Sequence, residues 1–254
     1  MSILSDYNRD GYVVVRNVLD ADLIKEASNH VEWLMKKNPG RRPEQLWQDL
    51  IPNDPFWVRL ISDRRLLDVA QEFIGPDIAL FASHYLCKPA GNGLPVLWHQ
   101  DGSYWPLDPM NVTTIWLAVD DSTPENGCMR VIPGTQHLKL QQLKERKDVT
   151  NVLSSEIDSS FVDESKAVDI ILKAGDLSVH HPNVIHGSNA NTSPKRRCGL
   201  TIRYIPTTTR ITVPWGCDFL LRGAAVPGIN DYKPFPKYVG GDSQMAFRDC
   251  AQWR

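Results

Sequence analysis

The chain has 254 residues, of which 42% are hydrophobic and 23% are charged, a composition typical of a soluble globular protein that buries a sizeable core. We expect one domain over residues 1–254, because all-β sandwiches and barrels often reach this length as a single unit. The formal net charge of −2 and the lack of any apolar run of about 18 residues argue against a nucleic-acid partner or a membrane span, and favour a small-molecule substrate.

The cysteines indicate the compartment. They are five in number, far apart and without a CxxC pair, which disfavours both a disulfide framework and a zinc ribbon. The first residues show no basic start followed by an apolar run, so no secretory signal is predicted. We therefore expect reduced thiols, a cytoplasmic location, and either a monomer or a homodimer.

Helical patterns come first along the chain. A short β-branched run at residues 11–15 precedes Asp20, which can cap an amphipathic helix with apolar positions as far as Met35. A second helix is predicted at residues 63–74, where Gly75 and Pro76 stop it. We expect these helices, within residues 20–75, to pack on a β core.

Strand patterns follow, because the apolar period changes from 3.6 to 2 at about residue 78. Helices followed by many short strands predict a mainly β fold with flanking α-helices and a double-stranded β-helix core, the jelly-roll, cupin-like arrangement. Charged residues 138–147 and 154–166 predict a solvated insertion, and residues 206–254 a loop-rich segment over the barrel mouth. The predicted strands are residues 78–88, 96–100, 112–120, 128–132, 168–172, 177–181 and 199–205.

The stretch WHQDGSYWPLDP places His99 and Asp101 among aromatic residues. In an extended segment, residues two apart point to the same face, so the imidazole and the carboxylate converge. The third ligand is predicted to be His186, which follows the apolar pair Val184-Ile185; the rival histidines are His180 and His181. Two histidines and one carboxylate leave coordination positions open, as Fe(II) oxygenases require, although a zinc hydrolase uses similar ligands.

Arg197 favours the iron oxygenase. It lies eleven residues after His186 and just before an extended stretch, so its guanidinium is placed to hold a carboxylate in bidentate fashion, such as the far end of 2-oxoglutarate. Ser188, two residues after His186, can add a hydroxyl to the same carboxylate. Lys195 and Arg196 are predicted to face solvent on strand parity.

The ordered pattern H-x-D, then H-G-S, then an arginine resembles the phytanoyl-CoA dioxygenase family of Fe(II)- and 2-oxoglutarate-dependent oxygenases. Further stretches agree, among them DGYVVVRNVLDADLI, NGCMRVIPGTQH and GDLSVHHPNVIHGS, and the resemblance extends to about Tyr204. It implies iron ligands His99, Asp101 and His186, and a distal-carboxylate site of Arg197 and Ser188. It also implies that Trp116 flanks this pocket and that His84 contacts the cosubstrate.

The reaction that the resemblance implies is oxidation of a C–H bond of a small metabolite, most simply hydroxylation, coupled to decarboxylation of 2-oxoglutarate to succinate and CO2. Its cofactors are Fe(II), 2-oxoglutarate and O2, with ascorbate as a supporting reductant. Related halogenases have Ala or Gly where Asp101 stands, so halogenation is not implied. Some members contact the cosubstrate through a lysine where residues 44–50 here have none, so that contact is either lost or supplied by Gln45 or Trp47.

Substrate residues are predicted more weakly. Tyr104 and Trp105 follow the ligand pair and can form pocket walls, whereas Arg130, Arg203 and Arg210 are candidate anchors for an anionic substrate. Two other functions stay open on the residues alone: a zinc-dependent hydrolase, and a non-catalytic metal- or ligand-binding jelly roll.

Overall fold

The computed structural model describes residues 2–46, 54–213 and 219–234. The amino-terminal part is helical, and each of its longer helices begins at an acidic cap: Asp20 accepts a hydrogen bond from the Leu23 amide, and Asp63 one from the Arg65 amide. No helix in the described ranges is both long and apolar enough to cross a membrane. The α-helices are α1 (Ile3–Asp10), α2 (Ala21–Lys37), α3 (Pro55–Ile61) and α4 (Arg64–Ile74).

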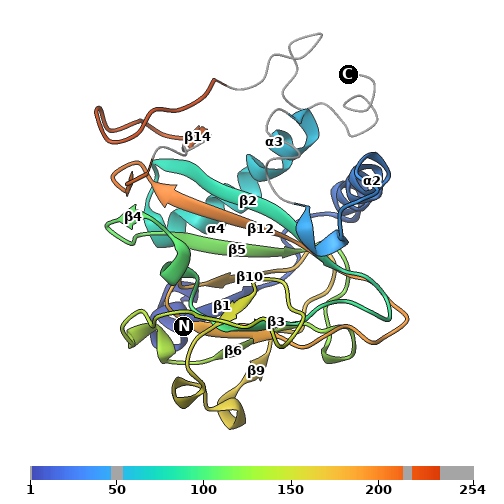
Figure 1. Cartoon of the computed structure of the whole chain (residues 1–254). Helices are drawn as coiled ribbons and strands as arrows, with labels where there is room; N and C mark the ends of the chain where they lie inside the picture. Colours follow the sequence, from blue (N-terminus) through green and yellow to red (C-terminus); the bar gives the residue numbers. More distant parts are fainter. Residues whose placement is uncertain (1, 47–53, 214–218, 235–254) are drawn as a thin grey trace.

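Two antiparallel sheets form the body of the molecule, and they face each other in Figure 1. The larger sheet has the order β1 (Tyr12–Val15), β10 (Leu177–His180), β5 (Thr113–Ala118), β12 (Arg197–Pro206), β2 (Ile78–Lys88) and β14 (Leu220–Arg222). The smaller sheet has the order β3 (Val96–His99), β11 (Ile185–Ser188), β6 (Met129–Ile132) and β9 (Val168–Asp169). This is the predicted double-sheet jelly roll with flanking helices.

Shorter elements complete the described chain. Two small ladders pair β4 (Leu107–Asp108) with β13 (Arg210–Ile211) and β7 (Lys144–Glu145) with β8 (Ser155–Glu156). Single 3-10 turns connect the longer elements: η1 (Pro43–Gln45), η3 (Asp101–Tyr104), η4 (Pro124–Asn126), η5 (Thr135–His137), η6 (Ser159–Phe161) and η7 (Glu164–Lys166).

Successive side chains of β12 point to opposite faces of the larger sheet, and the two faces border different regions of the interior. Leu200 and Ile202 belong to the main core, where the outer face of the larger sheet packs against α2, α3 and α4 (Figure 1). Gly199, Thr201 and Arg203 point the other way, toward the smaller sheet. The helices therefore supply the apolar core on one side, and the inner face is left for polar chemistry.

Several parts of the chain differ from expectation, beginning with helix α1, which was not predicted. Helix α3 was not predicted, because nearly all of its residues are buried and it shows no amphipathic period. The segment expected to be a solvated insertion contains the β7–β8 hairpin and the buried Ile157. In the expected loop-rich tail, β14 extends the larger sheet by pairing with β2.

The cysteine expectation is corrected at one pair. Cys87 and Cys198 stand opposite each other in the β2–β12 ladder, and the structure joins them in a disulfide. Their separation of 111 residues explains why spacing gave no signal. Cys128 is a buried free thiol, as expected for a small apolar side chain.

Candidate functional site

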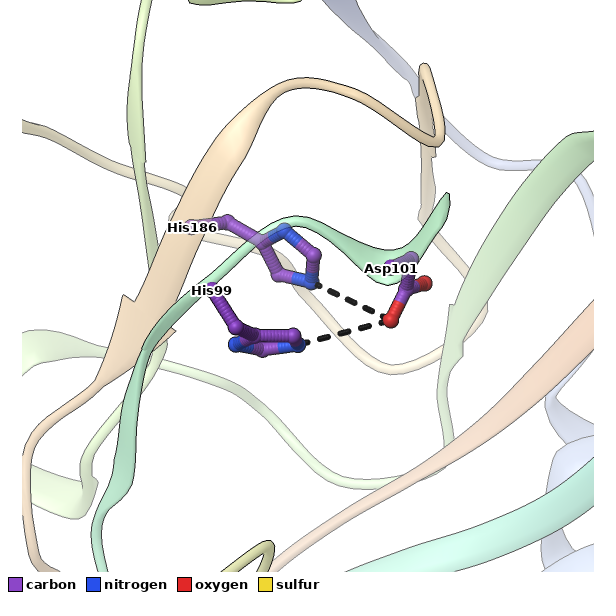
Figure 2. Close-up of side chains that lie close together, drawn as sticks. All are labelled: His99, Asp101 and His186. Atoms are coloured by element: carbon purple, nitrogen blue, oxygen red, sulfur yellow. Dashed lines mark ion pairs between the residues drawn. The ribbon is translucent and has the colours of Figure 1, made fainter. Parts of the chain in front are cut away.

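The three predicted metal ligands meet between the sheets. His99 ends β3, His186 stands opposite it in β11, and Asp101 begins η3 one residue beyond Gln100. One ligand atom from each lies within 4.8 Å of the others, and all three side chains are buried. Figure 2 shows both imidazoles directed at the same Asp101 oxygen, with Nε2–Oδ1 distances of 3.4 Å from His99 and 3.9 Å from His186.

Backbone carbonyls orient both histidines. Nδ1 of His99 lies 2.8 Å from the Leu97 carbonyl oxygen, and Nδ1 of His186 lies 3.0 Å from that of Val184. A carbonyl only accepts, so each Nδ1 carries the proton and each Nε2 offers its lone pair to the centre. This is the outer hydrogen bonding that fixes a metal-binding histidine in its tautomer.

The donor set fits iron. Two neutral imidazole nitrogens and one carboxylate oxygen, with apolar and open space on the other side, match the facial triad of non-haem Fe(II) oxygenases. Burial and the neighbouring His99 lower the pKa of His186 well below its ordinary value, so it stays unprotonated and available to a metal. Burial alone would raise the pKa of Asp101, but His180 and His99 outweigh it and hold that pKa well below the ordinary value.

The rival histidines have other positions. His180, in β10, approaches the second oxygen of Asp101 at 3.5 Å, so it faces the carboxylate from outside the cluster of three ligands. His181 accepts a hydrogen bond from the Asn183 amide through Nδ1 and is not part of the cluster of three ligands. His186 therefore remains the predicted third ligand, and His180 is a neighbour of the Asp101 carboxylate.

A second polar site lies beside the triad at the start of β12. Arg197 is 2% exposed, and its Nε has no hydrogen-bond partner within the described ranges. Its guanidinium carbon lies 5.2 Å from the centroid of Trp116 in the neighbouring strand β5. Burial lowers the pKa of Arg197 to about 10, so the side chain remains a cation at neutral pH. A buried guanidinium of this kind calls for an anionic ligand.

Arg196 lies on the opposite face of the sheet from Arg197, as parity requires, but it is half-buried and ion-paired where a solvent-facing residue was predicted. Its guanidinium forms ion pairs with Asp120 and Glu32, on the helix side of the sheet. Arg197 points inward, as alternation along a strand requires. The adjacent arginines therefore lie on opposite faces of the sheet, Arg196 in ion pairs on the helix side and Arg197 buried in the interior.

Sequence reasoning missed Lys88. This residue ends β2, is fully buried, and donates from Nζ to Ser188 Oγ at 2.7 Å and to the Asn189 carbonyl. It pairs in register with Arg197 across the β2–β12 ladder. The resemblance had pointed to residues 44–50 for this contact, and Trp47 lies outside the described residues. The only available signal was a lysine at the end of an otherwise apolar strand.

Gly199 makes room for Trp116. A Cβ at Gly199 would lie 2.1 Å from the Trp116 ring, so the two side chains cannot share this position. We expect Gly199→Ala to displace the ring and destabilise the protein by about 1–3 kcal/mol, the usual cost of overpacking. Thermal unfolding measures the loss, and near-UV circular dichroism reports the displaced ring. An unchanged unfolding midpoint would contradict the packing described here.

The triad and Arg197 open into one cavity of about 280 Å³. Tyr104 and Trp105 line it, as predicted, and Tyr104 is partly exposed at 36%. His84 also lines it, with Nδ1 lying 3.1 Å from Nη1 of Arg203. Apolar residues form most of the remaining wall: Phe81, Leu86, Val96, Met129 and Leu153.

Two predicted substrate anchors lie elsewhere. Arg130 forms ion pairs with Glu164 and Asp169 and does not line the cavity. Arg210 is exposed and donates to backbone carbonyls of residues 228 and 229. The alternation of β6 explains the first case, because Met129 and Val131 occupy the inward positions. Of the three arginines, the structure brings Arg203 alone to the cavity.

Comparison with known proteins places the chain among oxygenases. The family model described as Phytanoyl-CoA dioxygenase (PhyH) matches residues 7–199. Ectoine dioxygenase of Sphingopyxis alaskensis is 25% identical over 84% of this chain and 78% of its own length. L-proline trans-4-hydroxylase of Streptomyces griseoviridis is 25% identical over 87% of this chain and 92% of its own length.

Solved structures share the fold. A non-heme monooxygenase, ThoJ, in its apo form superimposes with a TM-score of 0.79 at 25% identity, covering 99% of this chain and 94% of the other. EctD from S. alaskensis with 2-oxoglutarate and 5-hydroxyectoine gives a TM-score of 0.67 at 21% identity, covering 91% and 86%. The chain belongs to the phytanoyl-CoA dioxygenase family and is a non-haem Fe(II)- and 2-oxoglutarate-dependent dioxygenase.

Proposed function

We propose that this protein hydroxylates a C–H bond of a small polar metabolite, with His99, Asp101 and His186 holding Fe(II). Bound iron supplies the activation of O2 and the oxidative decarboxylation of 2-oxoglutarate to succinate and CO2. The chain supplies a fixed donor set on one side of the metal and leaves the other side facing the cavity. Asp101 keeps the third protein position filled, which favours hydroxylation over halogenation.

The observation that carries the proposal is Arg197. It is a buried cation without an ion pair in the described residues, in the same cavity as the triad. A dicarboxylic keto acid that binds the metal at one end would present its other carboxylate to such a group. Ser188 adds a hydroxyl for the same carboxylate, and Lys88 holds that hydroxyl in place by donating a hydrogen bond to it. Hydrolysis at a zinc ion does not by itself require an arginine at this position.

The size of the cavity supports a small substrate. Its volume of about 280 Å³ is just below the usual range of about 300–1,000 Å³ for small-molecule sites, and the keto acid must share that space. Two relatives are named for action on ectoine and L-proline, both small metabolites. An acyl-CoA thioester is a much poorer match to these dimensions.

Substrate-independent turnover tests the proposal. Fe(II)-loaded protein with ascorbate and 2-oxoglutarate should release succinate slowly in the absence of a substrate, and the Zn(II)-loaded protein should not. Anaerobic addition of 2-oxoglutarate to the Fe(II) protein should also produce the visible charge-transfer absorption of a keto-acid chelate. Absence of both signals, with folded protein confirmed by circular dichroism, would reject the proposed function.

Lys88 predicts a pH dependence of cosubstrate binding. Burial, together with the charge of Arg197, lowers the pKa of Lys88 to about 6, so the free protein holds it largely neutral at pH 7. A carboxylate bound nearby favours the ammonium form and raises that pKa. Binding of 2-oxoglutarate should therefore take up a proton, and affinity should fall as the pH rises above about 6.

Calorimetry in buffers of different ionisation enthalpy measures this uptake. Lys88→Met keeps the length and apolar stem of the side chain but removes the titrating group, so it should abolish the proton uptake while the protein stays folded. Lys195→Met is the matched control, because Lys195 is exposed. Equal proton uptake by wild type and Lys88→Met would show that another group titrates.

A further inference from the structure

We propose that Arg203 is the anchor for an anionic group of the substrate, so that the substrate is a compact organic acid whose carboxylate or phosphonate binds this guanidinium. The inference rests on the proposed function and specifies its substrate class. The observation behind it is that the three candidate arginines differ in position. Arg130 and Arg210 are engaged outside the cavity, whereas Arg203 lines it.

The guanidinium of Arg203 is held in place on one side. Its Nη1 lies 3.1 Å from His84 Nδ1 and donates to Thr201 Oγ1 at 3.2 Å. Trp105 lies against the flat face, with its ring centroid 5.2 Å from the guanidinium carbon, and Phe81 packs edge-on against Trp105. These contacts reduce the entropy that the side chain would lose on binding a ligand.

The opposite edge of the same group is available. Nε of Arg203 is buried and has no hydrogen-bond partner in the described part of the chain. A guanidinium contains only donors, so His84 accepts through Nδ1 and is neutral, leaving the positive charge of Arg203 uncompensated by that contact. Arg203 also forms no ion pair with any residue of the described ranges. An oxyanion with two acceptor oxygens fits the edge formed by Nε and Nη2.

Arg203 and Arg197 serve different anions. They are six residues apart on the inward face of β12, which at about 3.3 Å per residue separates their Cα atoms by roughly 20 Å. The triad lines the same cavity, and Asp101 contributes to the electrostatic environment of Arg203. Ser188 lies toward Arg197, because Lys88 contacts Ser188 and pairs in register with Arg197. One five-carbon keto acid occupies the Arg197 end and the metal. The second cation then remains for the substrate.

The surrounding wall indicates the rest of the ligand. Phe81 and Leu153 are apolar, and Tyr104 is at the more exposed part of the cavity, where its hydroxyl hydrogen bonds with Ser155. A charged head against Arg203 would therefore place a compact, largely apolar body toward the triad. This geometry would direct a C–H bond, rather than the acidic group, at the metal.

Anion binding tests the assignment directly. Protein loaded with Ni(II) and 2-oxoglutarate is titrated by calorimetry with benzoate, methylphosphonate and the neutral benzamide. We expect at least one anion to bind saturably, benzamide to bind at least tenfold more weakly than benzoate, and Arg203→Met to weaken the anion by at least about tenfold. Arg203→Lys should restore part of the loss. Arg210→Met, an exposed arginine in the next strand, should bind the anion like the wild type.

The outcomes separate the two proposals. If neither anion binds, or if Arg203→Met binds it unchanged, the anchor assignment is wrong. It is also wrong if Arg203→Met loses the anaerobic Fe(II)–2-oxoglutarate absorption, because Arg203 would then hold the cosubstrate. If wild type itself shows no such absorption, the proposed function fails, whereas titration of the Ni(II) protein without keto acid still reports on Arg203.

Discussion

Asp101→Ala is expected to abolish turnover while leaving the protein folded. The substitution removes the one anionic ligand and leaves two neutral imidazoles, whose ring centroids lie 4.1 Å apart, to hold a divalent cation. Changes in the outer hydrogen bonds of metal ligands alone cost about 10–100-fold in affinity or activity, so loss of a ligand should lower succinate formation more than about 100-fold. Equilibrium dialysis against Fe(II), together with succinate quantification, measures both effects.

The matched control is Asp169→Ala. Asp169 is an exposed carboxylate on β9 that pairs with Arg130, outside the cavity. Its loss should leave both Fe(II) binding and succinate formation unchanged within about twofold, because surface ion pairs contribute little to stability. Asp101→Glu keeps the charge and should retain measurable iron binding. Wild-type iron affinity and turnover in Asp101→Ala would show that the metal lies elsewhere.

The ligand pair at His99 was predictable because parity is local. The backbone stays extended through Gln100, so His99 and Asp101 lie on one side although Asp101 already begins the η3 turn. Gln100 faces away and hydrogen bonds with the Asn183 carbonyl and the Gln141 amide. The strand limits were less accurate: β12 begins at Arg197, two residues before the predicted start, because its first pairings are with β2.

Features that depend on strand pairing were not predictable from local patterns. Lys88 hydrogen bonds with Ser188, which is 100 residues away in the sequence, and Cys87 is bonded to Cys198, which is 111 residues away. Both contacts follow from the alignment of distant strands, which a single sequence does not specify. The sequence could not rank Arg203 above Arg130 and Arg210 as the substrate anchor. Only the arrangement of side chains shows that the other two are engaged elsewhere.

Arg197→Met should raise the concentration of 2-oxoglutarate required for turnover more than any other change outside the triad. Truncating one partner of a buried charge pair costs about 2–5 kcal/mol, which corresponds to about 30- to 4,000-fold in apparent affinity. Iron binding should be unaffected, because Arg197 is not one of the three predicted ligands. The 2-oxoglutarate requirement of Arg197→Lys should lie between those of the wild type and Arg197→Met, because an ammonium keeps the charge but cannot form the bidentate pair.

Arg196→Met is the sharpest control that the chain offers, because the two arginines are adjacent on one strand and differ only in the face they occupy. Arg196 pairs with Asp120 on the helix side, so its loss should lower the free energy of unfolding slightly and leave the 2-oxoglutarate requirement unchanged. The opposite result, a raised requirement in Arg196→Met with a normal one in Arg197→Met, would mean that β12 presents its other face to the cavity. Gly199, Thr201 and Arg203 share the parity of Arg197, so the cosubstrate site and the substrate anchor would then fail together.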